Sequence, residues 1–479
     1  MAELLIVGAA TDGPIYEVTK STDIKSTVGL YGGNYIQRDS ITSSATSIVL
    51  DYFPWGNQIA NVVDGIKSQL YSPTVSPTGN IYTFGSTGAV SGNVLDLYYT
   101  PFLGYPDLIT AAKNYSQTTG KTPYVCRIGG SYATLAVSGW AILSKYPGAK
   151  YNNLSVTITP TSLTLTGLEP NFSTLTYIGS TPYDIYIQSQ NDYSYGISPI
   201  KITAYPGTGV NIGTTQLVNG SDGVLGDGSV SDTDIATFFD SFELPNEITH
   251  VLVLTPTTTG LINGIFNLYN DSDAQVRMFV APTPTWSGTT SGFSTLIGQA
   301  IPERLNLLGV VLGTGNSLIN NVFSNRYVAE NAVISLVNSV NYNFTNLKLN
   351  QVDFAPELNQ TDLDNLLSLG VMAPTRYIGN DISVYRGIMS NGVDTPPLVN
   401  IYSEIYSRSY PILFGYYGSI LNNGPQPTIE KNLVASLQSI PFLTNVACTS
   451  QYSLGELDIT VSGIFYDEVL SISFNINNG

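Results

Sequence analysis

The sequence predicts a multidomain protein of mixed α and β structure, with an α/β core around a parallel or mixed sheet, inserted β-rich domains, and strands at both chain ends. Helix-period segments alternate with short apolar runs between residues 217 and 312, which is typical of a sheet covered by helices on both faces. Segments rich in Thr, Ser, Tyr, Pro and Gly precede this block, and both ends of the chain have strand-like apolar patterns. A length of 479 residues predicts about two to four domains.

Low charge is the main feature of the composition. Lys and Arg number 18 and Asp and Glu number 35, so the net charge is −17, and charged residues make up 11 % of the chain against about 25 % in an average soluble protein. A hydrophobic content of 43 % is enough to build a core and argues against disorder. The scattered cations form no basic stripe, so we expect no direct binding of nucleic acid.

Membrane and export signals are not expected. No uncharged apolar run reaches the roughly 18–20 residues that a spanning helix needs. The first residues lack the basic segment of a secretory signal, and Glu3 stands where a positive charge is usual. We therefore expect synthesis in a cytoplasm and no membrane partner.

The block from 217 to 312 carries the clearest periodicity. A capping box at Ser231–Asp234 precedes one apolar helix face, and further helices are expected over 261–269 and 293–300. Between them lie continuous apolar runs, which predict strands buried on both faces, as in parallel sheets. These predicted strands are 250–254, 278–281 and 307–312.

Other segments complete the expected order of elements. Residues 159–216 predict an inserted β domain, in which Tyr183–Ile187 alternates like a strand, and residues 51–101 predict a second β-rich insertion. A helix over 107–115 leads to a strand over 124–128. In the C-terminal part, a capping box at Thr361–Asp364 starts a helix with a Leu363, Leu366 and Leu367 face and Gly370 at C′. A hairpin turn at 379–381, a helix through 429–440 and two alternating strands follow.

Both chain ends allow two interpretations. The residues concerned are Leu4, Leu5, Ile6 and Val7 at the start and Leu470, Ile472, Phe474 and Ile476 at the end. Each strand either pairs within its own subunit or completes the sheet of a neighbouring chain, because a strand edge is a template for another strand. The pattern alone does not decide between them.

Motifs for catalysis, cofactors or metals are not found in the sequence. There is no P-loop and no G-x-S-x-G turn, and His250 is the only histidine. Cys126 and Cys448 have no CxxC partners, so a Cys/His zinc site is not expected; they are interpreted as buried thiols, or else as members of a disulfide between subunits. The acidic residues from Asp222 to Asp234 lack calcium-loop spacing and are interpreted as a Gly-rich turn before a capped helix.

Several motifs, taken in order, resemble the tail sheath proteins of contractile-tailed phages and related contractile injection systems. Gly13-Pro14 followed by a strand over Thr22–Gly29 resembles the entry segment of that family. The helix at 107–115 with the strand Tyr124–Ile128 resembles its helix and "VRV"-type strand. Residues Tyr146–Leu154, which include Asn153, resemble the A-x-x-P-G-x-W/Y-G-N signature, with Asn152 in place of the glycine.

Two further matches are more specific. Residues Leu217–Gly223 resemble the L-x-G-G-x-D-G element of the family, with Gly220, Asp222 and Gly223 matching and Asn219 replacing the first glycine. Residues Leu358–Val371 resemble its L-T-x-x-E-x-x-x-L-x-x-x-G-I/V segment, in which Gly370 matches the glycine. The resemblance covers most of the chain, but after Arg386 it depends only on the order of helices and strands.

This resemblance implies a contractile structural protein, not an enzyme. Identical subunits would stack helically around a tail tube protein, joined by terminal arms, with baseplate and tail terminator proteins as further partners. The location would be the phage tail of a virion, assembled in the host bacterial cytoplasm. The implied domains are an N-terminal arm at 1–18, a first core part at 19–158, an outer β domain at 159–216, an α/β core at 217–345, a tube-facing domain at 346–466 and a C-terminal arm at 467–479.

Two other classes remain open from the residues alone. A β-rich surface or adhesin-like protein would fit the Thr, Ser, Asn and Tyr content, but the helix–strand block at 217–312 argues against it. A carbohydrate-active enzyme would need two suitably placed carboxylates, and the sequence offers no convincing pair.

Overall fold

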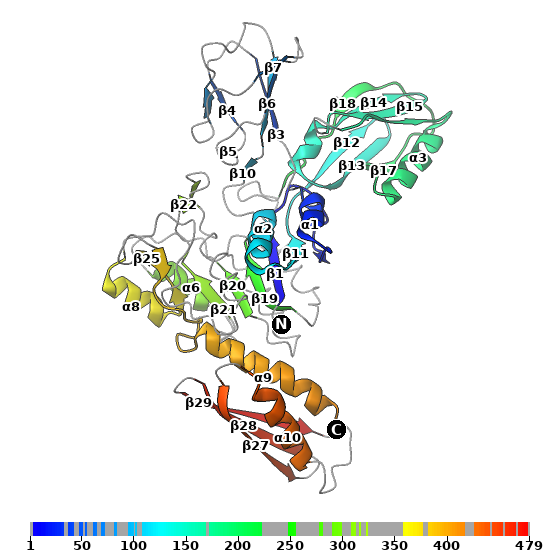
Figure 1. Cartoon of the computed structure of the whole chain (residues 1–479). Helices are drawn as coiled ribbons and strands as arrows, with labels where there is room; N and C mark the ends of the chain where they lie inside the picture. The colour runs from blue at the N-terminus through cyan, green and yellow to red at the C-terminus, as the bar shows by residue number, and fades with distance from the viewer. Residues whose placement is uncertain are drawn as a thin grey trace.

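Apolar strands from distant parts of the sequence pair side by side in one sheet at the centre of the protein. A computed structural model was used (Figure 1). It describes residues 3–32, 37–42, 47–50, 53–54, 61–64, 69–71, 81–83, 94–99, 101–102, 108–168, 172–222, 248–254, 277–280, 290–298, 308–312, 316–317, 322–323, 358–376, 382–416, 426–440, 443–453, 456–465 and 468–477. Among these residues, no helix is long and apolar enough to cross a membrane.

The central sheet has seven strands and is almost entirely parallel. In spatial order they are β2 (Val18–Thr19), β11 (Tyr124–Arg127), β1 (Glu3–Gly8), β19 (Ile248–Val253), β20 (Arg277–Val280), β21 (Leu308–Val311) and β24 (Val371–Met372). Every neighbouring pair is parallel except β2 with β11. The expectation of a parallel or mixed sheet built from apolar runs is confirmed, since β19, β20 and β21 are the strands predicted at 250–254, 278–281 and 307–312.

Helices cover this sheet and complete its core. They are α1 (Ile24–Leu30), α2 (Leu108–Thr119), α6 (Ser291–Gly298) and α8 (Gln360–Ser368). Buried side chains of α2, α6 and α8 belong to the same hydrophobic cluster as the strands. The hairpin strands β25 (Pro374–Arg376) and β26 (Ile382–Val384) are antiparallel, as predicted. The helices expected at 231–242 and 261–269 lie outside the described residues.

The first strand corrects the prediction of an N-terminal arm. β1 lies inside the sheet, with β11 paired along one edge and β19 along the other, so neither edge is left for another chain. Leu4, Leu5, Ile6 and Val7 are all fully buried in the core of their own chain. A run of consecutive apolar residues suits a strand covered on both faces, and this is the physical reason why β1 lies in the interior.

A second body with its own core spans residues 132–217. It contains a three-stranded sheet of β12 (Tyr132–Val137), β13 (Trp140–Pro147) and β17 (Ile200–Ala204), and a four-stranded sheet of β16 (Leu175–Ile178), β15 (Ser162–Thr166), β14 (Ser155–Thr159) and β18 (Gly213–Gln216). The short helix η2 (Ala149–Asn153) and α3 (Pro182–Ser194) belong to it. Its hydrophobic cluster runs from Ala133 to Leu217 and shares no residue with the cluster of the central sheet.

The strand expected at Tyr183–Ile187 is wrong, because these residues form the first turns of α3. Thr181 and Asp184 make a reciprocal capping box and Pro182 occupies the first turn, so local capping overrides the five-residue alternation. The same helix covers strand edges. The side-chain amide of Gln188 donates to the Ile178 carbonyl (2.6 Å) and accepts from the Ile178 N–H (3.2 Å).

The N-terminal insertion consists of antiparallel strands in the part that the structure describes. β3 (Gln37–Thr42), β9 (Val94–Tyr99), β6 (Asn61–Asp64) and β7 (Gln69–Tyr71) form one sheet, and β4 (Ser47–Val49) with β8 (Ile81–Thr83) and β5 (Phe53–Pro54) with β10 (Pro101–Phe102) form two pairs. The short strands β22 (Asn316–Ser317) and β23 (Val322–Phe323) pair separately.

The C-terminal part forms a third body, at the far end of the molecule from β12–β18 in Figure 1. Two helices, α9 (Pro396–Phe414) and α10 (Gln426–Leu437), accompany an antiparallel meander of β27 (Leu443–Ser453), β28 (Glu456–Phe465) and β29 (Glu468–Asn477). Ile429, Leu433 and Leu437 of α10 are buried against the same cluster as Leu457 and Ile459 of β28.

The C-terminal strand also differs from the predicted extended arm. All ten residues of β29 pair with β28 of the same chain, and the register places the Cα atoms of Leu470, Ile472, Phe474 and Ile476 opposite those of Gly463, Val461, Ile459 and Leu457. The strand pairs here because an adjacent antiparallel partner is reached by a short turn. Unlike β1, however, β29 is the last strand of its sheet.

Two local predictions are shifted. The capping box of α8 is formed by Asn359 and Asp362 and not by Thr361 and Asp364, although Leu363 and Leu366 are buried as expected. The segment Thr22–Gly29, expected as a strand, contains α1, because the Asp23 carboxylate accepts a hydrogen bond from the Ser26 N–H and caps a helix.

Candidate functional site: a buried polar junction

Several of the sequence motifs that resemble sheath proteins meet where the central sheet joins the second body, whereas the motif Leu358–Val371 does not. Four segments converge there, namely 11–14, 127–131, 147–152 and 217–222. They come from the loop after β1, the end of β11, the start of η2 and the segment after β18. The arrangement is a structural junction.

Arg127 is the central residue of this junction. It ends β11 and its side chain is fully buried. Its guanidinium donates to the carbonyls of Gly13 (3.1 Å) and Pro147 (2.7 Å) from Nη1, and to that of Asp222 (3.4 Å) from Nη2. A buried charge is costly unless it is hydrogen-bonded, and the planar fork of donors lets one arginine hold several segments together.

The electrostatics of Arg127 follow from this burial. Desolvation lowers the pKa of Arg127 from its usual value, while the charges of Asp222 and Asp12 act in the opposite direction. An arginine titrates so far above neutrality that the group stays cationic. The junction therefore contains two buried cations, Arg127 and Lys150, with the acidic residues Asp222 and Asp12 near them.

Asp222 links the segment after β18 to η2. Its side chain is buried, and Oδ1 accepts a 2.7 Å hydrogen bond from the N–H of Ala149, the first residue of η2. Asp222 thus contributes to the junction twice, through its carboxylate to Ala149 and through its main-chain carbonyl to Arg127. This gives a physical role to the acidic residue of the L-x-G-G-x-D-G-like motif.

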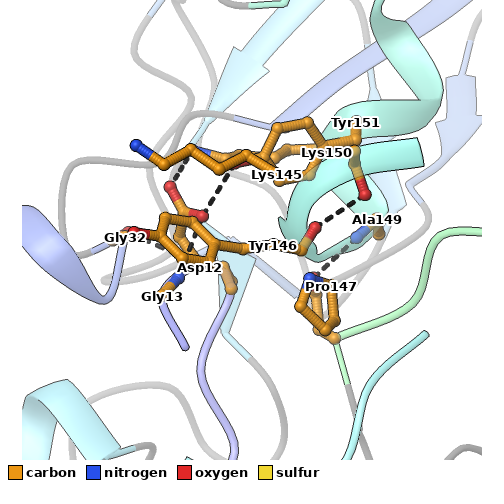
Figure 2. A network of polar contacts seen from close by, with 12 residues as sticks. Asp12, Gly13, Gly32, Lys145, Tyr146, Pro147, Ala149, Lys150 and Tyr151 are labelled. Atoms are coloured by element: carbon orange, nitrogen blue, oxygen red, sulfur yellow. Dashed lines mark hydrogen bonds and ion pairs between the residues drawn. The ribbon is translucent and has the colours of Figure 1, made fainter. Parts of the chain in front are cut away.

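Asp12 contacts the second and third residues of η2. Its carboxylate forms an ion pair with Lys150 Nζ and accepts hydrogen bonds from the Tyr151 hydroxyl (3.0 Å) and the Gly13 N–H (2.9 Å). Figure 2 shows these side chains meeting beside Pro147 and Ala149. Burial and the charge of Asp12 raise the pKa of Tyr151 well above its usual value, so the phenol remains a neutral donor.

Asn152 and Gly220 form the fourth contact. The Asn152 side chain accepts from the Gly220 N–H (2.8 Å) and donates to the Gly220 carbonyl (2.9 Å). A Cβ atom on Gly220 would lie 2.3 Å from the Gly148 carbonyl oxygen, so only glycine fits. The residue that departs from the family pattern, Asn152, is thus the one that makes this contact, while Asn153 ends η2.

The segment that enters the second body and the segment that leaves it are hydrogen-bonded to each other. Ser131 and Ser221 exchange backbone hydrogen bonds of 3.1 Å in both directions, and their hydroxyls lie 2.8 Å apart. Thr134 and Val218 exchange a similar pair of 2.7 and 3.0 Å. The body at 131–221 is therefore joined to the rest of the chain through one narrow, paired stalk.

The sequence identified part of this site. The structure brings Gly220 and Asp222 together with the segment that contains Asn153, whereas Gly223 lies outside the described residues. Gly370 is in another place, at C′ of α8, where its φ of +71° and a Cβ position 2.4 Å from the Met389 carbonyl oxygen both require glycine. The terminal residues singled out, Leu4–Val7 and 470–476, lie in the two sheets described above.

Several junction residues were not predicted as a site. They are Asp12, Arg127, Lys150, Tyr151 and Asn152. One signal was available for Arg127, since it is a charged residue inside the apolar run Tyr124–Ile128 of a chain with few cations. The partners come from segments far apart in the sequence, and no local pattern links them.

The cysteines and the histidine lie in strands of the sheets. Cys126 and Cys448 are both free, in different sheets, and Cys126 is buried. His250 is buried in β19. Within the described ranges, no group of three or more His, Cys, Asp or Glu side chains is placed to hold a metal ion.

Comparisons with known proteins agree with the fold. The sheath tail protein of Desulfitobacterium hafniense aligns over 99 % of this chain and 96 % of its own, with a TM-score of 0.58 and 13 % identity. The sheath tail protein of Listeria innocua aligns over 99 % of this chain and 95 % of its own, with a TM-score of 0.55 and 11 % identity. No family model matches the sequence, and no curated protein matches it.

These similarities define the class of fold. Nearly the whole chain, including its inserted bodies, has the multidomain α+β fold of sheath tail proteins. The resemblance that the sequence motifs predict is confirmed at the level of the fold.

Proposed function

We propose that this chain is a structural subunit of a contractile tail sheath, which polymerises helically around a tail tube and contracts to drive the tube through a host envelope. The observation that carries the proposal is the alignment with two sheath tail proteins over 99 % of the chain. A similarity that includes every inserted body supports a shared architecture more strongly than a match to the central α/β sheet would, because such sheets serve many functions.

The contacts at the junction support this role. A subunit of a lattice needs a defined orientation of its domains in each state of that lattice. Here the buried Arg127, the buried Asp222, the partly buried Asp12 and the paired backbone segments at Ser131 and Ser221 connect the second body to the central sheet. The Arg127 guanidinium donates to carbonyls of three segments, and this fixes how these segments lie relative to one another.

The C-terminal sheet is the part we propose for contacts between identical chains. β27 and β29 are the outer strands of the three-stranded meander, and no described strand pairs with their outer edges. In the second body, side-chain amides occupy such edges, as Gln188 does at Ile178 and Gln190 does at Ile202. In the C-terminal sheet, the Glu430 carboxylate accepts a hydrogen bond from the Ser450 N–H of β27 (2.7 Å). The ten-residue outer edge of β29 is therefore the edge that we propose for addition of a strand from a neighbouring chain.

Further partners follow from this role. We infer contacts with a tail tube protein, with baseplate proteins and with a terminator at the other end, in a virion or a tail-like particle. The few charges reduce the desolvation cost of many repeated contacts, and the acidic balance limits non-specific binding to nucleic acid during assembly. The proposal requires no catalytic step.

The assembly state of the purified full chain tests the proposal. Sedimentation velocity and negative-stain electron microscopy, over a range of salt and protein concentrations, should show hollow tubes, rings or stacked discs. Monodisperse monomers under every condition would contradict a sheath role. A chain that fails to fold is recognised separately by circular dichroism, so that loss of assembly and loss of structure are not confused.

A further inference from the structure

The contacts between the central sheet and the second body are polar, although each body has an apolar core. The hydrophobic cluster of the sheet and that of residues 133–217 have no residue in common. What joins them is the set of hydrogen bonds and ion pairs made by Asp12, Arg127 and Asp222. Polar interfaces between domains open more readily than apolar ones, since water can replace their hydrogen bonds.

We propose that this junction is a releasable latch, which holds the second body in one orientation while the contacts of Asp12 and Arg127 are made and lets it turn as a rigid body about the Ser131–Ser221 stalk when they are broken. The inference concerns the single subunit and does not depend on the proposed function.

The arrangement of contacts separates the stalk from the latch. Ser131 and Ser221 lie on the two chain crossings and bond to each other, so they move together. Asp12 lies on the sheet side and its partners Lys150 and Tyr151 lie on the second body, so these bonds must break for the body to turn. Arg127 likewise reaches across to the Pro147 carbonyl.

The backbone at the crossing provides a pivot. Gly129 and Gly130 follow Ile128, the residue after Arg127, and have φ values of +75° and +102°, a region that residues with side chains adopt rarely. Consecutive glycines absorb changes in backbone angle at low cost, as hinge residues do. Gly130 also lies against the latch, because a Cβ atom there would lie 2.8 Å from Arg127 Nη2 and 2.9 Å from the Ser221 carbonyl oxygen.

The second body has its own hydrophobic core, so it can remain folded when it turns. Its cluster contains fully buried Leu154, Val156, Ile158, Leu163 and Leu165, and α3 is capped within the same body. When the latch opens, water therefore replaces the polar contacts of Asp12 and Arg127, and the hydrophobic core of the second body stays buried.

Distance measurements between spin labels test the latch in the full chain. Labels are placed at Gln117→Cys on α2 and at Tyr195→Cys beside α3, both exposed positions, in a Cys448→Ser background that keeps buried Cys126. The parent is expected to give one narrow distance distribution. Asp12→Asn combined with Lys150→Met is expected to add a second, broader population at a changed distance.

Two matched comparisons make the result specific. Gly130→Ala (φ +102°) places a methyl group against Arg127 without removing a polar group. Gly120→Ala also puts a side chain at a positive φ (+70°) but meets nothing within 4 Å, so only the first variant should shift the distribution. The exchange Asp12→Lys with Lys150→Asp should restore the narrow distribution. Hydrogen exchange of residues 155–166 reports whether the second body stays folded.

Each outcome of these measurements either supports or overturns the proposed latch. A new distance population with unchanged protection of residues 155–166 supports a latch that releases a rigid body. An unchanged distribution in the Asp12/Lys150 and Gly130 variants overturns it. Loss of protection at 155–166 also overturns it, because the junction would then be part of the folding core of the second body.

Discussion

Ile6 lies opposite Leu252 in the parallel ladder between β1 and β19, and both side chains are fully buried. This pairing places the first strand of the chain inside its own sheet. We therefore expect Ile6→Ala to lower the free energy of unfolding of the subunit by about 2–5 kcal/mol, through lost apolar burial and a residual cavity. Urea denaturation monitored by circular dichroism measures the change.

The control for this prediction lies in the same strand. Glu3 forms a partly exposed ion pair with Lys20, so Glu3→Gln should change stability by no more than about 1 kcal/mol. If Ile6→Ala left stability unchanged and abolished only self-assembly, β1 would act as an arm between chains, and its assignment to the central sheet would be wrong.

The C-terminal strand gives a second prediction. Removal of residues 468–479 deletes every backbone partner that β28 has in β29. We expect amides of β28 that face this ladder to lose protection from hydrogen exchange in the monomer, while the central sheet keeps its protection. Unchanged exchange across 456–465 would instead mean that β29 is not held by its own subunit.

These two strands show what the sequence can and cannot predict. The apolar run Leu4–Val7 and the alternation Leu470–Ile476 each indicate a strand, and both strands exist. The partner of each strand cannot be predicted from a local pattern, because pairing depends on contacts distant in sequence. β1, for example, pairs with residues 124–127 and 248–253. A family resemblance favoured arms at both ends, but the structure pairs both strands within the chain.

Gly220 allows a direct test of the junction. A Cβ atom at Gly220 would lie 2.3 Å from the Gly148 carbonyl oxygen, whereas one at Gly207 meets nothing within 4 Å, and neither glycine has a positive φ. Gly220→Ala should therefore destabilise the chain by about 1–3 kcal/mol, as overpacking does, and Gly207→Ala should have little effect. Thermal unfolding of the two variants side by side makes the comparison. Equal melting temperatures would show that the close approach at Gly220 is not required.

The junction was only partly predictable for a physical reason. Gly220 and Asp222 stand in a short motif that can be recognised along the chain, but the Arg127 contacts depend on three segments brought together by the fold. Local sequence patterns also fail to predict the secondary structure of α3. The alternation of Tyr183–Ile187 fits a strand as well as a helix, and the capping box at Thr181 and Asp184 decides the outcome.

Cys448 yields a prediction about pH. Burial, with a smaller contribution from the charge of Glu430, raises the pKa of Cys448 to about 11. Because the thiolate is the reactive form, labelling by iodoacetamide at pH 8 should be roughly two-hundredfold slower than for an exposed thiol with a pKa of about 8.5, and should rise as the pH approaches 11.

Mass spectrometry of the labelled chain follows each thiol separately. Cys126, which is buried, should be labelled only after unfolding and serves as the internal control. A labelling midpoint for Cys448 near pH 8.5 would contradict the burial of this thiol beside Glu430.

The proposed sheath role requires a lattice of this subunit with an extended and a contracted form. Helical reconstruction by cryo-electron microscopy tests it most directly, using tubes of the purified chain before and after brief exposure to denaturant below the unfolding transition. We predict two helical lattices of the same folded subunit, one long and narrow and one short and wide. Tubes with a single unchanging lattice, or no helical assembly by a correctly folded chain, would contradict the account.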